Sequence, residues 1–321
     1  MKSFFLKLIA FVALVLAAQV VIARYIEPDP LVSSLNGYLR DRTQILFFGD
    51  SSVLPTGGSS DNQSSIIEMF QAANPAYKLG NLAHPAYHLG IYEAVLDYIS
   101  RAPSKPQAII FPVQLRSFSP EWDMRPVNQF EKEIFLLKDR TSFISYFYTP
   151  LAILRAIDVN SVSYTEFLKT PVYYGQKQAG IVEDFEAVDK NKPATEENIR
   201  DDYVYKYMFK LDRNQRKMKS LESLLDLADK AGTKIYVYIS PIDYETGTKF
   251  IGNDFVEQVA YNANLVCSVL EDKKMPCLDL TLSLTRDYFD YPAYPNEHLT
   301  AQGKRFVADR INAFFNQNPP R

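Results

Sequence analysis

The sequence lacks the features of nucleic-acid-binding or cofactor-dependent proteins. Its 321 residues carry 35 Lys and Arg against 38 Asp and Glu, so the formal net charge is −3 and no basic footprint for nucleic acid is present. There are only two cysteines, three histidines and one tryptophan. No internal repeat, low-complexity tract or cofactor motif is evident. Chemistry that depends on histidine must therefore use one of three side chains.

The two cysteines, Cys267 and Cys277, leave two interpretations open. An oxidising compartment would permit a disulfide that closes the short loop between them, and two buried free thiols are equally compatible with the sequence. Spacing alone does not fix the Cα geometry that a disulfide requires. Their pairing therefore stays open at the level of sequence.

The first 24 residues contain an apolar run that the remainder of the chain lacks. Lys2 and Lys7 come first, and residues 4–23 would form about 30 Å of helix, which is enough to cross a bilayer. Because basic residues precede the run and acidic residues follow it, the N-terminus would lie in the cytoplasm. A cleaved secretory signal is the competing interpretation. We favour a membrane anchor over residues 1–24 and a periplasmic or cell-surface domain over residues 25–321.

Apolar runs alternate with helical patterns along this domain. Residues 25–42 are interpreted as a connector and turn. Strands are expected at residues 45–48, 77–82, 107–113, 233–241 and 277–282, and helices at 63–73, 90–100, 219–231, 255–270 and 300–316. The alternation predicts an α/β fold with a mostly parallel sheet. In such sheets, functional groups gather beyond the carboxyl ends of the strands.

About 100 residues separate the third and fourth expected strands. Residues 117–216 are too many for a crossover and are rich in Tyr and Phe. We interpret them as a largely helical insertion that forms a lid or side wall over the edge of the sheet, with packing as its main role.

The first expected strand ends in Gly49-Asp50-Ser51, the place where functional groups are expected. A serine hydroxyl becomes a useful nucleophile when a base and oxyanion donors lie beside it. Gly49 allows the tight turn that would present the hydroxyl. The same three residues are also typical of an ordinary turn, so the motif needs a partner elsewhere.

His298 is the histidine best placed to be that partner. It precedes the last expected helix and follows the fifth strand, so it can return to the edge that carries Ser51. His84 and His88 follow the second strand, where they would line the mouth of the site or act as ordinary packing residues. A three-histidine metal site is not predicted, because Pro85 argues against a helix that would align His84 with His88.

At this point the chain resembles the SGNH/GDSL hydrolase superfamily. The likeness consists of a strand ending in Gly-Asp-Ser, "NL" after the second strand, "PVQL" after the third and "HLTAQG" at the last helix. It spans most of residues 44–315, with residues 117–216 outside it. The resemblance implies a flavodoxin-like, three-layer SGNH hydrolase fold, with Ser51 as the nucleophile and His298 as the general base.

The resemblance also implies an oxyanion hole built from three donors. These are the backbone N–H of Ser51, a backbone N–H after the second strand and an amide side chain after the third. The second falls at Ala86, where the family has glycine, and the third at Gln114, where it has asparagine. Glutamine carries the same amide donor one methylene further out, so the hole would be shifted.

The acid that normally supports the family's histidine is also replaced. In the family this acid usually lies three residues before the histidine, and that residue is Pro295 in this chain. Some acyl-transferring relatives have an aspartate two residues before the histidine, where this chain has Asn296. An asparagine can orient an imidazole, although it stabilises the imidazolium less than a carboxylate does. Asp290 and Glu297 are nearby carboxylates whose direction the sequence does not give.

An apolar N-terminal segment followed by an outside domain resembles a subgroup that works beside membrane-bound O-acyltransferases. That likeness implies a serine-dependent acyl ester hydrolase or O-acyltransferase acting on a cell-envelope glycan or lipid. Asp50 and Arg116 would contact substrate. Trp122 and Arg125 could join Arg116 in contacting an anionic or sugar substrate. The alternative interpretation, which we favour, is an arginine salt-bridged at the strand end and a tryptophan packed under the insertion.

The alternative function is a catalytically degenerate domain. Such a domain would serve as a binding or assembly subunit of an envelope acylation complex. The replacements at the expected glycine, asparagine and aspartate positions support this alternative.

Overall fold

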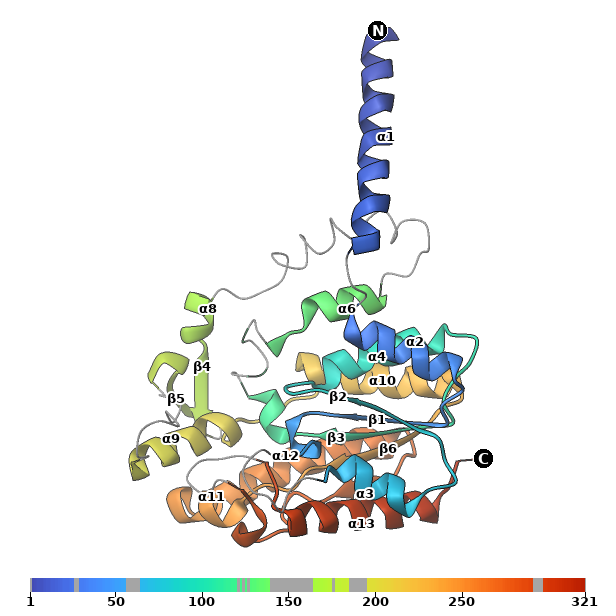
Figure 1. Cartoon of the computed structure of the whole chain (residues 1–321). Helices are drawn as coiled ribbons and strands as arrows, with labels where there is room; N and C mark the ends of the chain where they lie inside the picture. Colours follow the sequence, from blue (N-terminus) through green and yellow to red (C-terminus); the bar gives the residue numbers. More distant parts are fainter. Residues whose placement is uncertain are drawn as a thin grey trace.

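Five parallel strands form the central sheet, in the order β2-β1-β3-β6-β7 (Figure 1). The computed structural model describes residues 2–25, 29–55, 64–119, 122, 125, 128–138, 164–174, 177–184, 195–290 and 297–320. The strands are β1 (Ile45–Gly49), β2 (Leu79–Ala83), β3 (Ala108–Val113), β6 (Lys234–Ile239) and β7 (Cys277–Asp279). The predicted α/β fold with a parallel sheet is therefore confirmed, with β7 shorter than expected.

Helices cover both faces of this sheet, which explains why the inner strands β1, β3 and β6 are buried without alternation, whereas the edge strands β2 and β7 are partly exposed. In β1, Leu46 and Phe48 belong to one core and Ile45 and Phe47 to the other. The first core is closed by α2 (Pro30–Arg40), α4 (Leu89–Ser100), α10 (Arg216–Ala231) and α12 (Asn253–Asp272), and the second by α3 (Ile66–Ala73) and α13 (Ala301–Gln317).

Helix α2 corrects the expectation of a connector over residues 25–42. The Asp29 side chain caps the helix by accepting a hydrogen bond from Leu31 N at 3.0 Å, and Pro30 occupies the first turn. Leu31 and Leu35, one turn apart, are both buried. An Asp-Pro start followed by this spacing is a helix signal that could have been recognised in the sequence.

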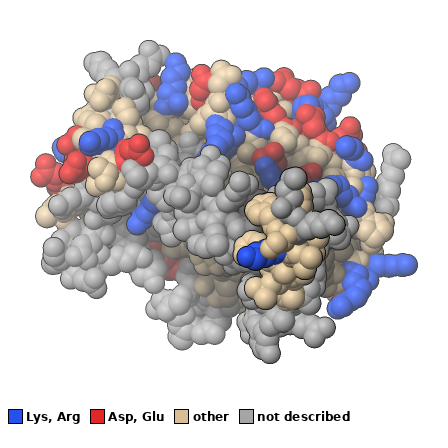
Figure 2. Space-filling view, turned by 90° about the horizontal axis from the view of Figure 1, so that it is seen from above, with Lys and Arg blue, Asp and Glu red and all other residues tan. Residues whose placement is uncertain are grey.

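The N-terminal segment forms α1 (Lys2–Tyr25), which extends away from the body of the molecule (Figure 1). None of the helices in the described part of the chain is both long enough and apolar enough to cross a membrane, so the transmembrane helix expected over residues 1–24 is not found there. Figure 2 views the molecule from above, and basic and acidic side chains are interspersed over the described part of that face.

The insertion at residues 117–216 contains strands as well as helices. Its described elements include α6 (Glu131–Lys138), α8 (Tyr164–Leu168), β4 (Pro171–Tyr174), β5 (Lys177–Ile181), η4 (Val182–Asp184) and α9 (Glu196–Tyr207). Strands β4 and β5 pair as an antiparallel hairpin, which the expectation of a largely helical insertion did not include. Helix α9 packs against α12 and α11 (Tyr244–Ile251). In Figure 1, β4, β5 and α9 lie beyond the end of the sheet at which β1 ends.

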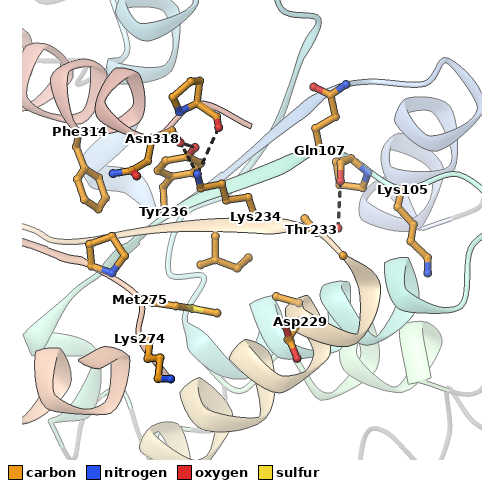
Figure 3. A pocket seen from close by; sticks show the side chains of 16 residues that line it. Lys105, Gln107, Asp229, Thr233, Lys234, Tyr236, Lys274, Met275, Phe314 and Asn318 are labelled. Carbon is orange, nitrogen blue, oxygen red and sulfur yellow. Dashed lines mark hydrogen bonds between the residues drawn. The ribbon is translucent and has the colours of Figure 1, made fainter. Parts of the chain in front are cut away.

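The opposite edge of the sheet, where the strands begin, carries a hollow of about 660 Å³ (Figure 3). Lys105, Lys234 and Lys274 lie around it, and Lys234 Nζ donates to the carbonyl of Asn318 at 2.6 Å. Near this edge, Cys267 and Cys277 form a disulfide with their Cα atoms 5.4 Å apart, which joins α12 to the start of β7. The structure thus selects one of the two states that the sequence left open.

Candidate active site

The turn after β1 is built by contacts between near neighbours in the chain. The carboxylate of Asp50 caps the 3₁₀ turn η1 (Ser51–Val53), accepting hydrogen bonds from Ser52 N at 2.9 Å and Ser52 Oγ at 2.6 Å. A Cβ at Gly49 would lie 2.2 Å from a methyl carbon of Val53, so only glycine fits there. The turn leaves Ser51 half-buried at the carboxyl edge of the sheet.

His298 is brought to the same edge by a short antiparallel bridge. Leu299 pairs with Phe289, and the carbonyl of His298 accepts a hydrogen bond from Asp290 N at 2.8 Å. Thr300 then caps α13. A Cβ at Gly303 would lie 2.6 Å from the Tyr288 carbonyl oxygen, which explains the glycine of the His-Leu-Thr-x-x-Gly pattern.

Ser51 and His298 meet across 247 positions of sequence. The Nε2 atom of His298 lies 3.0 Å from Ser51 Oγ, within the range of an O–H···N hydrogen bond. In the tautomer that carries its proton on Nδ1, the Ser51 hydroxyl donates to an unprotonated Nε2. An imidazole in that state can accept the hydroxyl proton as the oxygen attacks a carbonyl carbon.

Asn296, which the sequence predicts to orient His298, lies outside the described residues, and its role stays a prediction. Glu297, the neighbouring carboxylate, is described, and its contacts are with residues other than His298. Its Oε2 atom forms an ion pair with Arg116 Nη2 at 3.0 Å, and its Oε1 atom accepts a hydrogen bond from the Tyr207 hydroxyl at 2.5 Å.

Ala86 lies in the turn after β2, whose pairing with β1 continues through a hydrogen bond from His84 N to the Gly49 carbonyl at 3.1 Å, so it stands at the same edge of the sheet as Ser51. Its φ is +68°, a left-handed conformation that costs an alanine roughly 1–2 kcal/mol. Within the described part of the chain, the backbone N–H groups of Ala86 and Ser51 donate to no other backbone group. Both remain candidates for the oxyanion role, and the strained turn suits a functional site.

Gln114, the third predicted oxyanion donor, is already engaged. Its Nε2 atom donates to Ser52 Oγ at 2.5 Å and lies 3.4 Å from Asp50 Oδ1, and the side chain is buried. Its role in the oxyanion hole stays a prediction. In the arrangement described, the amide stabilises the turn after β1 and does not point a free N–H toward substrate.

Asp50 and Arg116, predicted to contact substrate, are both occupied by protein contacts. Asp50 is buried, and burial raises its pKa, against the lowering effect of its hydrogen bonds from Ser52. Arg116 pairs with Glu297 and lies 5.1 Å from the ring centroid of Trp122. This agrees with the structural interpretation of a salt-bridged arginine and a packed tryptophan, and substrate contact stays a prediction for both residues.

The other two histidines have different surroundings. His88 is buried and caps α4: its Nδ1 accepts from Gly90 N at 3.0 Å, and its Nε2 contacts the Asn128 carbonyl at 2.8 Å. Burial lowers its pKa well below the usual value, so the ring is a neutral structural element. His84 is exposed and stacks on Tyr87 with ring centroids 4.7 Å apart.

No known family description matches the chain, and no curated protein matches it. Several solved structures are similar to it at low scores. They include a possible lipase from Chitinophaga pinensis (12% identity, 86% of this chain, 98% of that chain, TM-score 0.41). A carbohydrate acetylesterase family member from Sinorhizobium meliloti has 10% identity over 86% of this chain and 98% of its own, with a TM-score of 0.37. At such scores these likenesses decide nothing about activity, which depends on the geometry around Ser51 and His298.

Proposed function

We propose that the chain is a serine-dependent acyl enzyme of the SGNH/GDSL type, either an acyl ester hydrolase or an O-acyltransferase. The observation that carries the proposal is the 3.0 Å contact between His298 Nε2 and Ser51 Oγ. It joins two loops at the carboxyl edge of a parallel sheet, where α/β enzymes place their reacting groups. The strained backbone of Ala86 at the same edge is a second supporting observation.

In the proposed reaction, Ser51 Oγ attacks the acyl carbonyl carbon and its proton passes to His298 Nε2. The N–H groups of Ser51 and Ala86 stabilise the oxyanion. As the tetrahedral intermediate collapses, the alcohol leaves with the proton from His298 and the acyl group remains on Ser51. Water or an acceptor hydroxyl then attacks this ester, giving its proton to His298, and Ser51 regains a proton as it departs.

The proposed substrate is an acylated glycan or lipid of the cell envelope, reached from outside the cytoplasm. The Cys267–Cys277 disulfide supports an oxidising compartment. Anchoring by the N-terminal segment and cooperation with a membrane-bound O-acyltransferase are further parts of the proposal. They rest on the order of the segments in the sequence.

A binding or assembly subunit is the second candidate function. The observation that favours it is the engagement of Gln114 Nε2 by Ser52 and Asp50, which leaves two oxyanion donors in place of the family's three. In that case Ser51 and His298 would be close together without catalysing acyl transfer.

A serine-reactive fluorophosphonate separates the two candidates. We expect the full-length chain in detergent to be labelled and to hydrolyse p-nitrophenyl acetate, and Ser51→Ala to lose both properties. Ser283→Ala removes an exposed loop hydroxyl after β7 and should retain both. Equal labelling of wild type and Ser51→Ala, together with no turnover by wild type, would favour the binding subunit.

A further inference from the structure

Glu297, immediately before His298, is the centre of a buried polar cluster. Its exposed fraction is 2% and that of Tyr207 is 1%. The carboxylate is paired with Arg116 through one oxygen and accepts the Tyr207 hydroxyl through the other. Burial raises the pKa of Tyr207 well above its usual value, so this hydroxyl stays protonated and donates to the carboxylate.

The two partners come from different parts of the chain. Arg116 lies on the 3₁₀ turn η2 (Leu115–Phe118) that follows β3, so it belongs to the sheet's own edge. Tyr207 is the last residue of α9, inside the insertion. The cluster therefore ties the insertion to the residue next to the proposed general base.

The buried side chain of Lys217 stabilises the backbone on either side of this cluster. Lys217, on the first turn of α10, is 1% exposed and donates to the carbonyl oxygens of Ser117 and Trp122. Trp122 in turn lies under the guanidinium of Arg116. The backbone next to Arg116 and the ring beneath its guanidinium are thus both held in place. Arg116 therefore has a defined position in which it pairs with Glu297.

Removing one partner of such a pair would be costly, because it leaves a charge buried without compensation. Among the described contacts, Glu297 Oε1 bonds to Tyr207 and Oε2 pairs with Arg116, and neither oxygen bonds to His298. In this arrangement the carboxylate is not the hydrogen-bond acceptor of the imidazole. Its influence on the histidine must pass through the backbone that joins the two residues and through the field of the cluster.

We propose that Arg116, Glu297 and Tyr207 are positioning residues through which the insertion holds His298 against Ser51. The insertion is then required for the chemistry itself, including reaction with esters too small to touch it. This inference rests on the proposed function for its kinetic consequences. Its structural part, that a buried cluster centred on Glu297 holds His298, can be tested without measuring activity.

Tyr207→Phe tests the link to the insertion, with Tyr203→Phe as the matched control. Both tyrosines lie on α9 and contact the ring of Phe255, with centroids 5.8 and 5.5 Å away, but among the described contacts only the Tyr207 hydroxyl reaches Glu297. We expect Tyr207→Phe to lower kcat for p-nitrophenyl acetate roughly tenfold and to leave KM little changed. An effect of this size corresponds to the loss of one hydrogen bond to a charged group. Tyr203→Phe should leave both constants near the wild-type values.

The field of the cluster provides a readout that does not need turnover. Replacing Glu297 by Gln removes a negative charge and leaves Arg116 unpaired, so the protonated imidazole becomes less favourable. We expect the pKa of His298 to fall by about half a unit in Glu297→Gln. It should return toward the wild-type value in Glu297→Gln/Arg116→Gln, where both charges are absent. Among the described residues, the other charged or titratable groups close to this loop are Asp50, Tyr203, Tyr207, Asp290 and Lys304, and all are unchanged in these variants.

The measurement is an NMR titration of the imidazole signals in the full-length chain, with the His298 signal assigned through its loss in His298→Gln. A downward shift in the single variant that is reversed in the double variant supports the proposal. If the pKa of His298 is unchanged in both variants and kcat falls only in proportion to the folded fraction, the cluster has a purely structural role. That result would overturn the proposal. If wild type is neither labelled nor active, the proposed function fails, and the titration still decides whether the cluster acts on His298.

Discussion

The two halves of the candidate site, the turn that carries Ser51 and the loop that carries His298, are held in opposite ways. The serine turn is stabilised mainly by its neighbours: Asp50 bonds to Ser52, two residues away, and Gly49 makes room for Val53. The histidine loop is stabilised by distant residues, since Tyr207 is 90 positions from Glu297.

The difference has a consequence for how each half tolerates change. The serine turn uses one distant side chain, because Gln114 donates to Ser52 Oγ, and its other hydrogen bonds lie within the turn itself. A loop held by distant contacts is only as well placed as the elements that supply them. We therefore expect variants of the histidine loop to uncouple activity from stability more readily than variants of the serine turn.

The largest expected effect comes from removing either half. His298→Gln and Ser51→Ala should each lower kcat/KM for p-nitrophenyl acetate by about 10³-fold or more, and the double variant should be no worse than either single one, because the pair acts as a unit. His84→Gln, which alters an exposed histidine, serves as the control. If the loss of activity in the double variant equals the combined losses of the two single variants, Ser51 and His298 do not act together in the same reaction step.

Gly303→Ala should break the histidine half while leaving the serine turn intact. The added methyl group would lie 2.6 Å from the Tyr288 carbonyl oxygen, so the loop must shift. We expect a loss of about 1–3 kcal/mol in the free energy of unfolding, measured with denaturant, and reduced esterase activity in the remaining folded protein. Gly37→Ala on α2 is the control, because no atom lies within 4 Å of its added Cβ, and it should be neutral or stabilising.

Asp50→Asn tests the serine half through pH. Because burial raises the pKa of Asp50, the stabilisation that its protonated form contributes is complete below the unfolded-state pKa of about 3.9 and is lost as pH rises through the raised value. An asparagine still caps the turn but does not titrate. Relative to wild type, the free energy of unfolding of Asp50→Asn should therefore rise as pH increases from about 4 to 8. A flat difference across this range would contradict the raised pKa.

The smallest effect on activity is expected at the far edge of the sheet. Cys267→Ser/Cys277→Ser removes the disulfide between α12 and β7, which closes a loop of 10 residues in sequence separation. Its loss should cost about 2–3 kcal/mol in the free energy of unfolding. The esterase rate of the folded protein should stay unchanged, because the bridge contacts neither half of the site. A parallel loss of kcat would show that α12 transmits stability to the site.

The same contrast explains what could be predicted from sequence. Strand runs such as residues 45–48 and the Gly-Asp-Ser and His-Leu-Thr-x-x-Gly motifs are local patterns, and they predicted the sheet and brought Ser51 and His298 into consideration together. The direction of Glu297 and the engagement of Gln114 with Ser52 depend on residues far away in the chain, and no local pattern encodes them. The β4–β5 hairpin was missed because it lies in an aromatic-rich segment without clear alternation, whereas the Asp29-Pro30 start of α2 was a readable signal.

The distance of 247 positions between Ser51 and His298 also has a consequence in time. During synthesis the hydroxyl emerges long before the imidazole that would activate it. The pair can form only once the loop before α13 has been synthesised and has returned to the edge of the sheet that carries Ser51. Under the proposed mechanism, Ser51 is no more nucleophilic than a surface hydroxyl until that late step, so the nascent chain would not react with esters before it has folded.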